Sequence, residues 1–466
     1  MARVSGRGVL VVGLTVGVVA AVIAAIQSQS AGAGGAQLNV LLITLDTTRA
    51  DRLGPYGSTS TRTPNLDRLA REGVVFEDTW SVAPLTLPAH ASLFTGLLPA
   101  RHGVRENAGF VLASSHVTLA EQLASEGFVT AGFAASVVLD ESSGIAQGFE
   151  TYVGGFRSHA GASPAGVRLR RPADVVVGQA MSWWLERRPS RFFAWAHFYD
   201  AHAPYEPPEP FLGEYAGRPY DGAVAFVDQQ IGVLLDFLDR QGVLDHTIVA
   251  VVGDHGESLG EHGEAQHGLF LYESVIRVPL IIRAPVPGMA ARRVSALTRI
   301  IDVMPTLEEL VGVDPHPRSE GRSLVGLMRG RDAAPDREAY AENTYPGSRF
   351  GWGELRALRS GRFKLIATTR PELYDLERDP QEQENLFGER PRLARAMLAR
   401  LTAVGGNASA HRPSPLTASS ERERREQLAS LGYVGSGWPT VGEGPPRDAP
   451  DPKDKVDEYN RRTSRR

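Results

Sequence analysis

Blocks of apolar residues alternate with amphipathic segments along most of this chain, and the alternation predicts strands followed by helices. Continuous apolar runs that close on polar residues are typical of strands buried on both faces. We predict such strands at 38–46, 74–76, 128–136, 192–200, 247–256 and 277–282. Apolar positions at helical spacing predict helices at 64–73, 118–127, 175–186 and 220–241. The pattern therefore predicts an α/β fold with a central, mostly parallel sheet and helices on both of its faces.

The segment from Pro84 to Gly96 is predicted to be a loop that enters a short helix. Pro88 suits the first helical turn, and Gly96 suits the helix end. Thr86 stands just ahead of this helix, where unpaired backbone N–H groups and the helix dipole favour an anionic ester. A threonine in this position is more often only a cap or turn residue, so Thr86 needs partners elsewhere in the chain.

Polar residues follow the predicted strands at 38–46 and 247–256. In a parallel α/β sheet, functional groups gather at the carboxyl ends of the strands, so Asp46, Asp254 and His255 are predicted to converge. Two carboxylates, an imidazole and the Thr86 hydroxyl suit one divalent metal ion: Mn, Ca, Mg or Zn. Each aspartate alone is more often a turn residue, and only the combination favours a metal site.

A smaller α+β subdomain is predicted at 331–405, after a main domain at 38–330. Its predicted elements are paired strands over 356–368 with a turn at 359–363, a strand at 373–376 and a helix at 390–404. The tail at 406–466 is mostly polar and charged, and we expect disorder there apart from a candidate helix at 421–431.

The composition excludes several classes of function. A net charge of −4 gives no electrostatic reason to expect a nucleic-acid partner. The chain has no cysteine, which excludes disulfides, thiolate metal sites and a cysteine nucleophile.

The N-terminus has the order of an export signal. Arg3 and Arg7 precede an apolar run at 9–26, and a stretch of small and polar residues follows at 27–37. The apolar run is also close to the length of a membrane-spanning helix, so a cleaved signal peptide and a retained membrane anchor both stay open. In either case we expect the bulk of the chain to be exported, in the periplasm or another extracytoplasmic space.

Several motifs follow one another in a specific order. They are Asn39–Asp46 (NVLLITLD), Gly54–Gly57 (GPYG), Thr63–Ala70 (TPNLDRLA), Pro88–Gly96 (PAHASLFTG), His202–Tyr205 (HAPY), Gly253–Gly256 (GDHG) and Leu373–Leu386. In this order they resemble the sulfatases and their relatives in the alkaline phosphatase superfamily. The resemblance implies one divalent metal ion on Asp46, Thr86, Asp254 and His255. It also implies catalytic roles for Thr86, His202, His267 and His90, the three histidines contacting the substrate.

The chain departs from the sulfatase pattern at four positions. Sulfatases have a cysteine or serine, converted to formylglycine, where this chain has Thr86. The signature arginine is replaced by His90, the carboxylate after the first metal aspartate by Thr47, and the lysine that contacts the ester by His267.

The threonine changes the chemistry that the resemblance implies. A formylglycine hydrate expels sulfate by breaking its own C–O bond, whereas threonine has no second hydroxyl on that carbon. A covalent adduct on Thr86 must instead be cleared by water that attacks sulfur or phosphorus. We therefore expect a metal-dependent hydrolase or transferase of anionic phosphoesters, small or polymeric. A sulfatase that works without formylglycine and an inactive binding ectodomain are the alternatives.

Overall fold

The computed structural model describes residues 38–156, 169–331, 337–405 and 448–463. The apolar run at 9–26 and the candidate helix at 421–431 lie outside these ranges. Within them, every helix is too short or too polar to cross a lipid bilayer. The elements described below belong to one compact unit, Asn39–Arg466.

The main sheet has nine strands. They are β1 (Asn39–Leu45), β2 (Val74–Trp80), β3 (Val129–Phe133), β4 (Thr151–Val153), β5 (Phe192–Phe198), β6 (Thr247–Gly253), β7 (Arg277–Arg283), β8 (Arg292–Val294) and β9 (Thr298–Arg299). Their order is β4-β3-β5-β1-β6-β7-β2-β8, with β9 also paired to β2. The strands β4, β3, β5, β1 and β6 are parallel, and β7 is antiparallel to both of its neighbours. The predicted mostly parallel sheet is confirmed.

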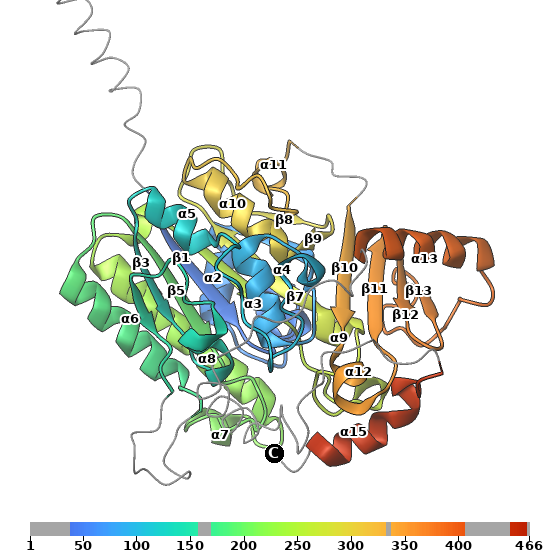
Figure 1. Cartoon of the computed structure of the whole chain (residues 1–466). Helices are drawn as coiled ribbons and strands as arrows, with labels where there is room; N and C mark the ends of the chain where they lie inside the picture. The colour runs from blue at the N-terminus through green and yellow to red at the C-terminus, as the bar shows by residue number, and fades with distance from the viewer. Residues whose placement is uncertain (1–37, 157–168, 332–336, 406–447, 464–466) are drawn as a thin grey trace, which may run out of the picture. The chain divides into compact units, whose positions relative to one another are not determined.

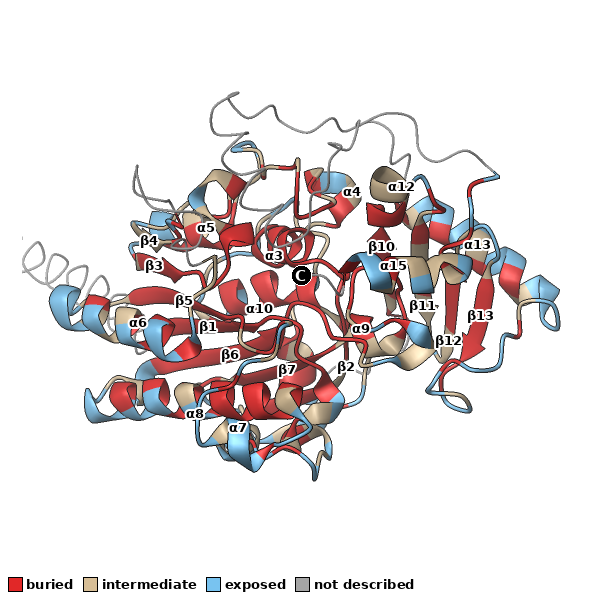
Figure 2. Cartoon of the chain, turned by 90° about the horizontal axis from the view of Figure 1, so that it is seen from below, coloured by how far each residue is buried: buried red, intermediate tan, exposed pale blue. Residues whose placement is uncertain are grey.

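Helices cover both faces of this sheet (Figure 1). The α-helices are α2 (Pro64–Glu72), α3 (Thr86–Thr95), α4 (Pro99–His102), α5 (Leu119–Ser125), α6 (Ala173–Arg187), α7 (Phe211–Glu214), α8 (Pro219–Arg240), α9 (Glu273–Ile276), α10 (Val303–Leu310), α11 (Val325–Met328), α12 (Tyr345–Phe350), α13 (Pro391–Gly405) and α15 (Val456–Thr463). Short 3-10 helices are η1 (Ala50–Arg52), η2 (Gly54–Tyr56), η3 (Val137–Leu139), η4 (Glu141–Ser143), η6 (Leu244–His246), η7 (Glu261–Gly263), η8 (Ile300–Asp302) and η10 (Pro452–Lys455). Figure 2 shows α8 on one side of the buried sheet and α3 with α5 on the other.

Alternation along β1 and β5 divides their side chains between the two faces. Leu41 and Ala196 belong to the apolar core beneath α2, α6 and α8. Thr44 and His197 are directly paired across the two strands and point to the opposite face. The polar groups of these strands therefore lie on the side that α3 covers.

A second sheet contains β10 (Glu338–Asn343), β11 (Leu355–Ser360), β12 (Phe363–Ala367) and β13 (Glu372–Asp375), all antiparallel in that order. It shares an apolar core with the main sheet, in which Trp80 and Leu85 pack with Ala341 and Tyr345. The completely buried Lys364 crosses the same boundary, with its Nζ 3.0 Å from a carboxylate oxygen of Glu273.

The structure corrects three predicted details of these elements. β2 continues to Trp80 instead of ending at residue 76, because it is paired along that length by β7 and β9. The predicted turn at 359–363 is narrower, since β11 includes Ser360 and β12 begins at Phe363. Thr86 is the first residue of α3 and does not precede it.

The expected disorder of the tail is wrong for residues 448–463. They form η10 and α15, and Tyr459 is buried in the core shared by the two sheets. The sequence did not predict these helices, because the segment has few apolar residues and its stability comes from contacts with distant loops.

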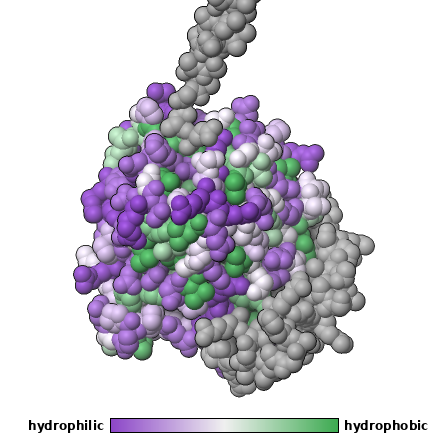
Figure 3. Space-filling model, turned by 90° about the vertical axis from the view of Figure 1, so that its left-hand side faces the viewer, coloured by the Kyte–Doolittle hydropathy of each residue, from purple (hydrophilic) through white to green (hydrophobic). Residues whose placement is uncertain are grey.

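The face of the molecule that carries α6 is mainly hydrophilic, with apolar groups interspersed (Figure 3). Exposed large apolar side chains in the described chain include Val175 and Leu185 on α6. Single apolar residues of this kind are ordinary on soluble surfaces.

Candidate active site

Two neighbouring strands bring the predicted metal ligands together. Leu45 at the end of β1 is paired with Gly253 at the end of β6, so Asp46 and Asp254 leave the sheet side by side. The Asp254 backbone N–H donates to the Leu45 carbonyl at 3.2 Å. One ligand atom from each of Asp46, Asp254 and His255 lies within 4.8 Å of the others, and all three residues are buried.

Each aspartate has one oxygen bonded to the protein and one without a hydrogen-bond partner. Asp46 Oδ2 accepts from Thr86 Oγ1 at 3.3 Å and from His197 Nε2 at 3.2 Å, whereas its Oδ1 has no partner. Asp254 Oδ1 accepts from two backbone N–H groups, one of them that of Thr47 at 3.2 Å, whereas its Oδ2 has no partner.

His255 has the same arrangement. Its Nδ1 donates to the carbonyl of Gly256 at 3.0 Å, and its buried Nε2 has no partner. Orphaned polar atoms are costly in a protein interior, and three converging residues that each carry one offer the donor set that a divalent cation would satisfy. The bonded atoms hold each ligand in place in the way that outer contacts of metal sites do. These residues therefore fit a metal ion.

The electrostatics of the three ligands agree with this fit. Burial, followed by the charge of Asp46, raises the pKa of Asp254 well above its usual value. Burial lowers the pKa of His255 to about 3, which keeps its imidazole neutral and its Nε2 lone pair available. Two buried carboxylates that repel each other are stabilised by a cation between them.

Thr47 supports the site through its backbone. It adopts a left-handed conformation with φ 50°, which is unusual for a β-branched residue. Its N–H donates to Asp254 and its carbonyl accepts from Tyr220 Oη at 2.7 Å. The Thr47 hydroxyl is buried without a hydrogen-bond partner.

α3 presents Thr86 to the two aspartates. Thr86 is completely buried at the first position of this helix, and Gly96 ends the helix with φ 66°. The Leu87 N–H donates to Asn107 Oδ1 at 2.8 Å, so an asparagine from the following loop caps the helix start. Asn107 Nδ2 is buried without a partner, next to the residue that carries the hydroxyl.

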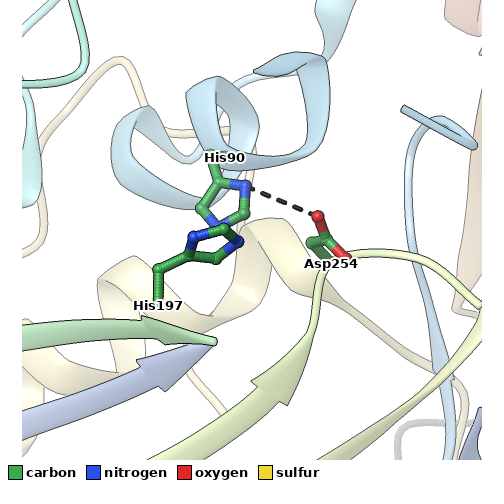
Figure 4. A group of neighbouring side chains, drawn as sticks. All are labelled: His90, His197 and Asp254. Atoms are coloured by element: carbon green, nitrogen blue, oxygen red, sulfur yellow. Dashed lines mark ion pairs between the residues drawn. The ribbon is translucent and has the colours of Figure 1, made fainter. Parts of the chain in front are cut away.

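His90 and His197 lie next to each other beside Asp254 (Figure 4). His90 Nδ1 donates to the Thr86 carbonyl at 2.8 Å and lies 3.7 Å from Asp254 Oδ2. His90 Nε2 is 3.0 Å from Thr44 Oγ1, and that hydroxyl oxygen accepts from Trp195 Nε1. The Thr44 proton therefore points to His90, and His90 is a neutral imidazole.

The neighbouring ring is fixed in the same way. His197 Nδ1 accepts from the Ala135 N–H at 3.1 Å, so its proton is on Nε2 and is donated to Asp46. His90, His197 and Asp254 also place ligand atoms within 4.8 Å of one another. Since both ring nitrogens that face the aspartates carry protons, the two histidines are donors that position the ligands. The contact of His90 with ester oxygens, which the sequence predicted, is less consistent with this geometry than a positioning role.

His202 and His267 lie on the open side of the site, 9% and 6% exposed. Their ring centroids are 4.9 Å apart, and the His267 ring lies 4.6 Å from that of His255. His202 Nδ1 donates to the carbonyl of Ala203, and burial lowers its pKa to about 3. His267 Nδ1 is 2.9 Å from Glu257 Oε1, which forms a histidine–carboxylate pair.

All of the site residues predicted from the sequence lie in this region, whereas three neighbours were missed. Asn107 is in an irregular loop, and His197 is inside an otherwise apolar strand. Glu257 follows the GDHG motif and lies 10 residues before its partner His267. Of these three residues, only His197 gave a signal in the sequence, because a histidine in the middle of a buried strand is unusual.

Comparisons with known proteins agree with the fold. The Sulfatase family model matches residues 38–313, and a model described as N-sulphoglucosamine sulphohydrolase, C-terminal, matches 260–404. An arylsulfatase of Clostridium perfringens is 25% identical over 436 residues, covering 75% of this chain and 90% of the relative. Human arylsulfatase A is 28% identical over 434 residues, covering 75% and 83%. The crystal structure of a phosphonate monoester hydrolase of Agrobacterium radiobacter has a TM-score of 0.66 at 23% identity, covering 79% of this chain and 95% of that one.

The protein belongs to the sulfatase family, within the alkaline phosphatase superfamily. It is a sulfatase-family ester hydrolase with a buried aspartate and histidine cluster suited to a metal ion.

Proposed function

We propose that this protein hydrolyses or transfers singly charged phosphoesters, with Thr86 as covalent nucleophile beside one divalent cation on Asp46, Asp254 and His255. The observation that carries the proposal is the convergence of Asp46, Asp254 and His255, each with one orphaned polar atom, next to the Thr86 hydroxyl.

The surroundings of Thr86 suit an attacking hydroxyl. Its Oγ1–H already points to Asp46 Oδ2, so the proton has an acceptor within the site. A divalent cation, when bound, lowers the pKa of a ligated hydroxyl and draws charge from the ester oxygen. The start of α3 and the Asn107 Nδ2 donor face the region where negative charge develops in the transition state.

His267 is placed to exchange a proton with the leaving alcohol. The Glu257 carboxyl group, 2.9 Å from its Nδ1, fixes the ring and turns the opposite nitrogen away from Glu257. Tyr205 donates to the other Glu257 oxygen at 3.0 Å and fixes that carboxylate. After the first step the same imidazole accepts a proton from the water that clears the Thr86 adduct. We assign His202 to substrate binding.

The threonine favours phosphorus over sulfur as the attacked atom. Without the second hydroxyl of a formylglycine hydrate, the adduct on Thr86 is released only by attack of water on its central atom. The alkaline phosphatase relatives that use an unmodified threonine in this way act on phosphate esters, and the resemblance extends that chemistry to this chain.

The charges near the site favour a substrate with one negative charge. The chain has only three lysines, Lys364, Lys453 and Lys455, and each is paired with acidic side chains. Histidines replace the family arginine and lysine at His90 and His267. One divalent cation balances the two aspartates, so a phosphate monoester dianion would bring its second negative charge to positions where the family has an arginine and a lysine and this chain has histidines.

Sulfate-ester hydrolysis is the second candidate, because the matching family model and the arylsulfatase relatives carry that activity in their names. A sulfate monoester is also singly charged, so the charge argument does not separate it from a phosphodiester. If the apolar run at 9–26 directs export, as we expect from the sequence, the enzyme acts outside the cytoplasm, on an ester that the cell meets there.

The test uses purified protein loaded separately with Mn, Mg, Zn or Ca. Aryl phosphodiester, phosphonate monoester, phosphate monoester and sulfate ester substrates carry the same leaving group, and Thr86→Ala is the matched variant. We expect turnover of the diester and phosphonate, loss in Thr86→Ala, and an adduct on the Thr86 peptide by mass spectrometry. Turnover of the sulfate alone, unchanged in Thr86→Ala, contradicts the proposal. Inactivity on every ester supports a binding ectodomain.

A further inference from the structure

α15 near the C-terminus packs against the loop that carries His267. Tyr459 Oη donates to the His267 carbonyl at 2.5 Å. Asn460 Nδ2 donates to the Gly263 carbonyl at 2.7 Å, and its Oδ1 accepts from the Ala265 N–H at 3.1 Å. Two side chains of one helix therefore hold three backbone groups of the loop.

The contact between α15 and the loop is close. A Cβ added to Gly268 would lie 2.8 Å from Tyr459 Oη. Tyr459 is 2% exposed and belongs to the same core as Leu85, the residue directly before Thr86. The tyrosine thus lies between the nucleophile helix and the histidine loop.

The segment before α15 is anchored on the second sheet. Asp451 Oδ2 accepts from Thr369 Oγ1 at 2.8 Å and from the Arg370 N–H at 2.9 Å. The Gly353 N–H donates to the Pro450 carbonyl at 2.9 Å. These bonds tie the start of the segment to the strand connection at 368–371 and to Gly353 ahead of β11, and α15 follows directly and contacts the active-site loop.

The rest of the loop is also fixed from the side of the second sheet. Asn343 Nδ2, at the end of β10, donates to the carbonyls of Gly268 and Leu269 at 2.9 and 3.0 Å. Glu264, inside the loop, accepts from the Leu269 N–H at 2.6 Å. Tyr459 supplies the bond to the His267 backbone itself. Both family models end before α15, so this element is an addition to the matched region, which extends to residue 404.

We propose that α15 holds the active-site loop in its working conformation, with Tyr459 and Asn460 as positioning residues for His267. The inference rests on the proposed function, since it assigns His267 the proton transfer to the leaving group. Glu257 fixes the His267 ring and Tyr459 fixes its backbone, so the imidazole is held at both ends. Loss of either anchor displaces it relative to Thr86.

Displacement of a proton donor has a specific kinetic consequence. Proton transfer matters most for a basic alcohol and least for a nitrophenolate, which leaves without assistance. Tyr459→Phe keeps the buried ring and removes only the hydroxyl. We expect about 10- to 100-fold lower kcat on an alkyl phosphodiester. Turnover of a bis-nitrophenyl phosphodiester should change by less than about threefold, with KM unaltered.

The experiment compares full-length wild type, Tyr459→Phe and Asn460→Leu, with Asp457→Asn as the control on the exposed side of the same helix. Two quantities are measured: kcat over a series of leaving groups, and hydrogen exchange of the backbone amides at 261–268. In both test variants we expect faster exchange in that segment and a steeper dependence of kcat on leaving-group pKa. Asp457→Asn should match the wild type in both measurements.

A uniform loss of kcat for all leaving groups overturns the positioning role, because general destabilisation affects every substrate alike. Unchanged kinetics and unchanged exchange in Tyr459→Phe also overturn it. If the wild type is inactive on every ester, the proposed function fails, and the exchange measurement alone decides about α15. Faster exchange at 261–268 then supports the anchoring of the loop, and equal exchange refutes it.

Discussion

Replacing His197 with phenylalanine tests whether the metal site depends on its supporting hydrogen bonds. Phenylalanine fills nearly the same volume and removes both ring nitrogens. The structure gives His197 two bonds: it accepts from the Ala135 N–H at 3.1 Å and donates to Asp46 Oδ2 at 3.2 Å. The substitution therefore leaves one buried N–H unsatisfied and removes a bond that holds the Asp46 carboxylate in its orientation.

The two losses have different magnitudes and different signatures. An unsatisfied buried N–H costs about 1–3 kcal/mol of folding free energy, with or without metal. Loss of an outer hydrogen bond to a ligand typically lowers metal affinity about 10- to 100-fold. At a metal concentration about 100 times the wild-type Kd, the cation adds about 2.7 kcal/mol to stability, and a tenfold weaker site gains only about 1.4 kcal/mol.

The assay is a titration with Mn, followed both by the thermal midpoint and by direct calorimetry, on wild type and His197→Phe. His102→Phe is the matched control, because His102 is equally buried and equally bonded. Its Nδ1 accepts from the Val104 N–H and its Nε2 bonds to Ser92 Oγ, and neither partner is a metal ligand. Both variants should lose stability without metal, and only His197→Phe should lose affinity. Equal Mn affinity in wild type and His197→Phe refutes the positioning of Asp46 by His197.

Three further outcomes follow from the same site. Thr86→Ser should keep measurable turnover and Thr86→Ala should lose it by at least about 100-fold, both measured with the aryl phosphodiester. Asn107→Leu removes the cap on the Leu87 N–H and should cost about 1 kcal/mol in urea unfolding. Asn107→Asp keeps the acceptor but should slow turnover, because a carboxylate beside the ester repels it. Chelation of divalent cations should lower the thermal midpoint, since Asp46 and Asp254 then face each other uncompensated, and added Mn should restore it.

The residues at the strand ends could be predicted because their position follows from the fold class. Once β1 and β6 are recognised as buried parallel strands, Asp46 and Asp254 must leave the sheet at the same edge. The identity of the strands that flank β1 is not visible in the sequence. His197 on β5 becomes a partner of Asp46 only because β5 pairs with β1 along its other side.

The pattern of apolar and polar residues could not predict contacts between irregular segments that are distant in the sequence. Asn107 caps α3 from a loop without periodicity, and Tyr459 contacts the His267 loop across 192 residues of chain. α15 has the composition of a disordered tail, and its order comes from specific polar bonds and from the burial of Tyr459 in a distant apolar core. Such bonds depend on the tertiary structure that brings their partners together.

Glu106 links this site to the second sheet and makes the stability of the link depend on pH. It directly precedes Asn107, and its carboxylate accepts from Thr344 Oγ1 at 3.1 Å, just after β10. Burial raises the Glu106 pKa from 4.5 to about 7. The folded state then binds more protons than the unfolded state between these two values, so the stability contributed by protonated Glu106 is present below pH 4.5 and is lost as pH rises through 7.

At 1.36 kcal/mol per pKa unit, the loss between pH 4.5 and pH 7 amounts to about 3 kcal/mol at most. Glu106→Gln keeps the shape and cannot ionise, so it should remove this decline. Urea unfolding of both proteins at pH 5 and pH 8 measures their free energies of unfolding. We expect the free energy of Glu106→Gln, relative to that of the wild type, to be higher at pH 8 than at pH 5. A constant difference at the two pH values would show that Glu106 is already ionised in the folded protein. In that case the loop that carries Asn107 is held by a charged anchor, and its contact with Thr344 is a charge-assisted hydrogen bond that persists across the working pH range.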